Sequence, residues 1–74
     1  MKAFIQIAIH GKGDEIRQKL TDIPEIKEVH MLFGEWDFLT LIEIEDAEQL
    51  ASFVIENIRK IDGVKLTSTM ICLK

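Results

Sequence analysis

The N-terminal segment alternates between aliphatic and other side chains with the period of a β-strand. In residues 3–9, AFIQIAI, one set of alternate positions is wholly aliphatic: Ala3, Ile5, Ile7 and Ile9. The other set carries Phe4, Gln6 and Ala8. Residues two apart share one face of a strand, so this segment predicts a strand with a continuous aliphatic face. The sequence HGKGD then breaks the alternation.

A short amphipathic helix is predicted next. Ile16, Leu20 and Ile23 recur at helical spacing. Asp14 and Glu15 supply an acidic first turn, which suits the positive end of the helix dipole. Because proline cannot continue a helix, we expect Pro24 to end it.

Two strands joined by a tight hairpin follow. Residues 26–33 place Val29, Met31 and Phe33 on one face and Glu28, His30 and Leu32 on the other. Gly34 and Glu35 fit a two-residue type II′ loop, in which glycine takes the first position. Residues 36–44 then form the third strand.

A longer helix and a final strand complete the chain. Asp46 followed by Gln49 is a capping-box-like start. An apolar stripe follows it: Ala47, Leu50, Ala51, Val54, Ile58 and Ile61. Gly63 in the Asp62-Gly63 pair can take the positive φ that closes a helix, and VKLTSTMICL is rich in strand-forming residues.

The order β-α-β-β-α-β defines the expected fold class, which is α+β. It predicts one domain over residues 1–74, a ferredoxin-like βαββαβ sandwich with a four-stranded antiparallel sheet. Right-handed crossovers place both helices on one face of that sheet. The other face would stay uncovered while carrying Phe4 and other apolar side chains, so we expect a face-to-face dimer.

Composition supports association and argues against nucleic-acid binding. Of the 74 residues, 47% are hydrophobic and 30% are charged, whereas an isolated domain of this size buries only about 60% of its surface. Nine basic residues scattered among thirteen acids give a net charge of −4, which disfavours phosphate binding. The chain has no apolar run of membrane-spanning length and no signal-peptide pattern. We expect a cytoplasmic protein, with its one cysteine, Cys72, as a buried hydrophobe.

Most reactive residue types lack the neighbours that chemistry requires. His10 and His30 are too few for a metal site, and Cys72 and Ser68 have no evident base. The HGKG segment lacks the spacing of a phosphate-binding loop and is typical of a turn. We therefore expect no catalytic residues, no metal and no cofactor.

Two polar stretches favour a different kind of site. GEWD offers backbone N–H groups and the carboxylate of Asp37, while Thr67, Ser68 and Thr69 offer hydroxyls. Each is also typical of an ordinary turn or strand. Together they provide an acceptor for an ammonium group and donors for a carboxylate, which a free α-amino acid needs.

These motifs resemble the effector domain of the Lrp/AsnC family, also called the RAM domain. The resemblance covers nearly the whole chain through IPEIKEVHMLFGEWDFLTLIEIED and IDGVKLTSTMICL. It rests on a proline with an aliphatic-x-Glu-Val run after the first helix, a Gly-x-aromatic-Asp hairpin, and a Gly-Val followed by a threonine-rich strand. Phe33 and Trp36 depart from the threonine and tyrosine common in the family, which makes the expected pocket more apolar.

The resemblance implies a homodimer that builds a ring of dimers, commonly an octamer, with a free amino acid bound between dimers. It assigns one wall of the ligand site to the hairpin residues Gly34, Glu35, Trp36 and Asp37. It assigns further hydrogen-bond donors to Ser68 and Thr69 of the last strand, which a neighbouring subunit can supply. Family transcription factors also carry a helix-turn-helix. The chain begins at the first strand, so we expect a stand-alone member that modulates full-length Lrp/AsnC-type regulators or other partners without touching DNA.

Three other functions are compatible with the sequence. The chain would also suit a purely architectural subunit that co-assembles with full-length regulators and needs no ligand. A small dimeric ferredoxin-like enzyme would need a reactive residue with a partner in the cleft, and no such pair is evident. An ACT-type amino-acid sensor has the same element order, but HGKG matches its glycine-rich first loop only weakly.

Overall fold

Strand β1 (Lys2–Ile9) lies in the interior of the sheet and pairs on both sides. The computed structural model describes residues 1–74. The other strands are β2 (Ile26–Met31), β3 (Phe38–Glu43) and β4 (Val64–Ile71). The sheet order is β2-β3-β1-β4, every pairing is antiparallel, and Ile5 pairs with Thr40 on one side and Thr69 on the other.

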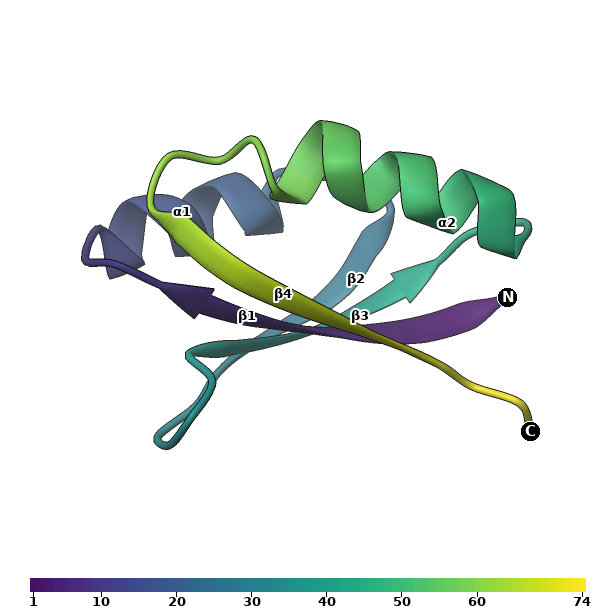
Figure 1. Cartoon of the computed structure of the whole chain (residues 1–74), viewed down its shortest axis with the longest axis horizontal. Helices are drawn as coiled ribbons and strands as arrows, with labels where there is room; N and C mark the ends of the chain where they lie inside the picture. The colour runs from purple at the N-terminus through teal and green to yellow at the C-terminus, as the bar shows by residue number, and fades with distance from the viewer.

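Both helices cover one face of this sheet (Figure 1). Helix α1 spans Gly13–Thr21, and α2 spans Ala47–Phe53 before continuing as a π-helical turn, η1, at Val54–Ile58. The Asp46 carboxylate accepts a hydrogen bond from the Gln49 N–H at 2.8 Å, so the predicted cap of α2 is confirmed. The predicted α+β fold with a ferredoxin-like strand order is also confirmed.

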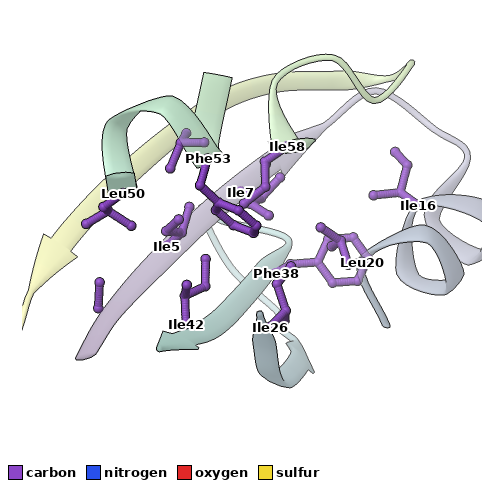
Figure 2. Close-up of a cluster of buried hydrophobic side chains, with 12 residues drawn as sticks. Ile5, Ile7, Ile16, Leu20, Ile26, Phe38, Ile42, Leu50, Phe53 and Ile58 are labelled. Carbon is purple, nitrogen blue, oxygen red and sulfur yellow. The ribbon is translucent and has the colours of Figure 1, made fainter. Parts of the chain in front are cut away.

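The aliphatic face of β1 forms the centre of the core. Ala3, Ile5 and Ile7 are fully buried beneath the helices. Side chains from the helices and the sheet point toward one another there (Figure 2). The other buried apolar residues come from α1, β2, β3, α2 and η1: Ile16, Leu20, Ile26, Phe38, Ile42, Leu50, Phe53, Val54 and Ile58. The predicted facing of β1 is therefore confirmed.

The β2–β3 hairpin differs from the prediction. Strand β2 ends at Met31 and β3 begins at Phe38, so the loop has residues 32–37 rather than two. A hydrogen bond of 2.8 Å from the Leu32 N–H to the Asp37 carbonyl closes its base. Gly34 has φ of +157°, far from the first position of a type II′ turn. The tip pairs with nothing, and the Phe33 side chain is fully exposed.

Helix α2 also differs from its predicted apolar stripe. Leu50, Val54 and Ile58 are buried as expected, but Ala47 and Ala51 are exposed. Phe53, outside the stripe, is buried instead. The two alanines instead line an open space between the helix and β4. The last strand ends at Ile71 rather than Leu73, which is almost fully exposed.

The sheet face opposite the helices is only partly covered. Phe4, Leu39 and Leu41 are half-buried there, and Leu66 and Met70 are exposed. No helix of the chain has the length and apolar character needed to cross a membrane.

Candidate functional site

The predicted ligand hairpin is a six-residue loop that projects beyond the sheet (Figure 1). Phe33, Gly34 and Glu35 are exposed, whereas Trp36 and Asp37 are half-buried at its base. A second hydrogen bond, of 2.9 Å from the Asp37 N–H to the Ile7 carbonyl, connects the base of the loop to β1. The loop is therefore held firmly at one end and is open to solvent at its tip.

Asp37 has a structural partner that the sequence did not reveal. Its Oδ2 atom accepts a hydrogen bond from the Ile9 N–H at 2.9 Å. The pairing of β1 with β3 ends at Ile7 and Phe38, so no backbone carbonyl of β3 is opposite Ile9. The Asp37 carboxylate accepts the hydrogen bond from the Ile9 N–H instead. The other carboxylate oxygen, Oδ1, has no hydrogen-bond partner in the chain.

The hairpin tip also presents unused donors. The N–H groups of residues 33–36 make no hydrogen bond within the chain. A tip with free N–H groups therefore lies next to one free carboxylate oxygen. These are the two kinds of group that an α-amino acid requires for its carboxylate and its ammonium.

The two hydroxyl residues predicted for the same site lie on opposite faces of β4. Thr69 pairs with the buried Ile5, so it faces the helix layer, while Ser68 pairs with Gln6 on the open face. Successive strand residues always alternate in this way. A single ligand on one face of this strand therefore meets only one of the two side chains.

Nor does one chain bring the hairpin and β4 together. Strand β1 lies between β3 and β4, and Ile7 pairs with Phe38 on one side and Thr67 on the other. Two strand spacings amount to about 10 Å. Within one chain, Ser68 and Thr69 therefore lie at least two strands away from the start of β3, where the hairpin ends.

A groove that sequence reasoning missed runs between α2 and β4. We call it the α2–β4 groove; it has a volume of about 320 Å³ and nine lining residues, six of them hydrophobic. One wall is Ala51, Val54 and Ile55, and the other is Thr67, Thr69 and Ile71. The only sign of this groove in the sequence is a pair of small apolar residues four positions apart, Ala47 and Ala51, and their spacing predicts core positions. Arg59 lies at one end of the groove.

The HGKG segment forms a turn, as predicted, and is tied to the turn before β4. Gly11 and Lys12 take left-handed backbone angles, with φ of +61° and +58°, and α1 starts at Gly13. The His10 N–H donates to the Gly63 carbonyl at 2.8 Å, and the Lys12 ammonium pairs with the Asp62 carboxylate. Their hydrogen bond and opposite charges raise the pKa of Lys12 and lower the pKa of Asp62.

The two histidines lie apart and in different settings. His30 makes an exposed contact of 2.8 Å with Glu28 on the same strand, while His10 lies at the far end of β1. The chain has no group of three or more His, Cys, Asp or Glu side chains placed to hold a metal ion.

The family model of the Lrp/AsnC ligand binding domain matches residues 2–74. The chain belongs to the Lrp/AsnC family. The resemblance noted in the sequence is thereby confirmed over almost the whole chain.

Two regulators and one hypothetical protein are similar to this Lrp/AsnC domain. The HTH-type transcriptional regulator FL11 of Pyrococcus furiosus is 40% identical over 73 residues, covering 97% of this chain and 48% of that protein. Hypothetical protein PHS023 of Pyrococcus horikoshii has a TM-score of 0.88 and 36% identity, covering 99% and 89% of the two chains. The regulator NMB0573 of Neisseria meningitidis, solved as a complex with L-Met, has a TM-score of 0.85 and 26% identity, covering 99% and 49%.

This domain spans less than half the length of the curated relatives that it matches. Several of these relatives are HTH-type transcriptional regulators, and one, 39% identical over 59 residues, is a homocitrate synthase of Sulfurisphaera tokodaii.

Proposed function

We propose that this Lrp/AsnC domain is a non-enzymatic effector module that binds a free amino acid at the β2–β3 hairpin and modulates a regulator or another partner. The observation that carries the proposal is the arrangement at Asp37. Ile9 holds one carboxylate oxygen in place, while the other oxygen is free beside the open N–H groups of the hairpin tip. The regulator NMB0573, which matches this chain with a TM-score of 0.85, was solved as a complex with the amino acid L-Met, and this supports the proposal.

In the proposed complex, Asp37 Oδ1 accepts a hydrogen bond from the ligand ammonium. The N–H groups of residues 34–36 donate hydrogen bonds to the carboxylate of the amino-acid ligand, and Trp36 provides an apolar wall for its side chain. Because Ser68 and Thr69 face opposite sides of β4, one of them completes the site from a neighbouring subunit. This requirement ties ligand binding to assembly.

The open sheet face supports a face-to-face dimer. Leu66 is 57% exposed and Met70 is 41% exposed on this face, beside the half-buried Phe4 and Leu41. Antiparallel sheets of this kind commonly pack face to face over such apolar surfaces. We propose a dimer through this face and a ring of dimers, such as an octamer, that brings hairpins to neighbouring subunits; light scattering of a stable 8.5 kDa monomer at micromolar concentration would contradict it.

Calorimetry against the twenty amino acids tests ligand binding, and Asp37→Asn tests the role of Asp37. The asparagine amide oxygen can still accept from the Ile9 N–H, but the side chain no longer carries a negative charge. We expect amino-acid affinity to fall roughly 10- to 150-fold, the worth of a charge-assisted hydrogen bond, with little loss of stability. Glu35→Gln is the matched control for the lost charge, because the Glu35 side chain is exposed and the proposed complex uses only the N–H group of this residue.

The outcomes separate this function from the architectural alternative. Binding of an amino acid that Asp37→Asn leaves unchanged would remove Asp37 from the site. No heat with any of the twenty amino acids, from a protein that still assembles and associates with a full-length regulator, would favour a purely architectural subunit.

A further inference from the structure

The two edges of the sheet are built differently. At the β2 edge, a register shift between Ile26 and Glu28 interrupts a strand of only six residues. Bulges and short strands are the usual ways in which proteins prevent edges from pairing. At the β4 edge, the register with β1 is regular from Leu66 to Ile71, and its one irregularity lies before Leu66. The second edge is therefore competent to pair with another strand.

Three residues of β4 present unpaired backbone groups at this edge. The Cys72 N–H donates to the Lys2 carbonyl at 2.9 Å, toward β1. In an antiparallel pair, alternate residues point their N–H and C=O groups to the same side. Leu66, Ser68 and Met70 thus also bond to β1, and the groups of the residues between them point outward: Thr67, Thr69 and Ile71. Strand β4 has no second neighbour, so these groups stay unpaired.

The side chains of these same residues form the strand wall of the α2–β4 groove. Figure 1 shows β4 at the near edge of the sheet, below α2. A strand added to this edge would turn alternate side chains toward the helix layer. They would enter the groove, whose volume of about 320 Å³ is at the small end for a ligand pocket. Backbone pairing would give affinity and the groove would select apolar side chains, as in other cases of strand addition.

The charges at the two ends of the groove give the added strand a direction. Arg59 and Lys65 both line a hollow at the start of β4, and Arg59 forms no ion pair within the chain. The acids Asp46 and Glu48 flank Ala47 at the opposite end, where α2 begins. A strand antiparallel to β4 ends at the cationic end, so its terminal carboxylate would meet two cations.

We infer that the free edge of β4 and the α2–β4 groove form a docking site for the extended C-terminal segment of a partner protein. The segment binds antiparallel to β4, places apolar side chains from alternate residues in the groove, and directs its terminal carboxylate to Arg59 and Lys65. This site contains no residue of the hairpin, and of the two hydroxyl residues proposed for the amino-acid site it includes only Thr69.

Labelled peptides test the site directly. The probe is a fluorescein-labelled hexapeptide with valine and threonine at alternate positions and a free C-terminal carboxylate, followed by fluorescence anisotropy. We expect saturable binding that weakens about two- to tenfold for the peptide amide. The Arg59→Gln variant should bind the peptide with a free carboxylate and the peptide amide with more similar affinities, because a cation that distinguishes the two peptides is gone. A peptide N-methylated at alternate residues should not bind.

Two substitutions at one position separate backbone pairing from side-chain contact. Thr67→Pro removes one outward N–H and leaves the bonds to β1 in place, so peptide binding should weaken at least about threefold. Thr67→Val keeps the N–H group and the β-branched shape, so the affinity of this variant for the peptide should be within about twofold of the wild-type affinity. Asp37→Asn should leave peptide binding unchanged, so failure of the amino-acid proposal would not affect this one.

Amide hydrogen exchange supplies a readout that does not depend on a variant folding. Without peptide, the amides of Thr67, Thr69 and Ile71 should exchange quickly, while those of Ser68 and Met70 are protected. Added peptide should protect the first set. Absence of saturable binding up to millimolar peptide would overturn the inference. So would protection of Thr67, Thr69 and Ile71 without peptide, because a second copy would then occupy the edge.

Discussion

Gly63 lies where three elements meet, and Gly63→Ala should destabilise the fold by a calculable amount. Its φ of +97° is in the left-handed region that disfavours side chains. A Cβ atom there would lie 3.0 Å from Cδ1 of Ile16, which is 1% exposed and so has little room to move. The substitution therefore combines backbone strain with a steric contact in the core.

The two effects have separable magnitudes. Left-handed backbone costs an alanine about 1–2 kcal/mol, and displacing the Ile16 side chain from its rotamer costs about 0.5–1.5 kcal/mol. The lower entropy of the unfolded chain offsets about 0.4–1 kcal/mol. We expect a net loss of about 0.5–3 kcal/mol, at roughly 4–8 °C of melting temperature per kcal/mol for a domain of this size.

Gly11→Ala is the matched control for the backbone effect. Gly11 also has a positive φ, +61°, but a Cβ atom there would have nothing within 4 Å. Urea unfolding of both variants, at one protein concentration because association alters apparent stability, gives the steric contribution as their difference. Ile16→Val removes the Cδ1 atom, so Gly63→Ala should cost about 0.5–1.5 kcal/mol less in that background. Equal losses for the two alanine variants, with no coupling to Ile16→Val, would refute the reasoning.

Three further predictions rest on single contacts or on charge. Asp46→Ala removes the bond to the Gln49 N–H and should lower the free energy of unfolding by about 0.5–2 kcal/mol in urea titrations. Lys12 lowers the pKa of Asp62 in the folded protein, so their pairing contributes stability at pH values above the unfolded pKa of about 3.8. That stability is lost as the pH falls through the lower pKa of the folded protein. Asp62→Asn should therefore make the free energy of unfolding depend less on pH in the acid range, in urea titrations at several pH values. The 74-residue chain, with net charge −4, should give no mobility shift with random duplex DNA at low salt; a salt-sensitive complex would contradict this.

Local sequence determined the elements and their order. The alternation in residues 3–9, the acid-rich start of α1 and the cap at Asp46 each depend on near neighbours alone, and each is present in the structure. The fold class follows from the order of elements, because few topologies join these strands with right-handed crossovers. The family was also readable from local motifs in the hairpin and the last strand.

Only the tertiary structure decided what surrounds the candidate site. The bond from the Ile9 N–H to Asp37 joins residues 28 positions apart, and no local pattern predicts it. The same holds for the hairpin length, which depends on how Leu32 and Asp37 pair, and for the burial of Phe53 in place of Ala47 and Ala51. The opposite facing of Ser68 and Thr69 follows from strand geometry, but which face each takes depends on the register with β1. Period and propensity are properties of neighbours along the chain, whereas sites are made by residues that only packing brings together.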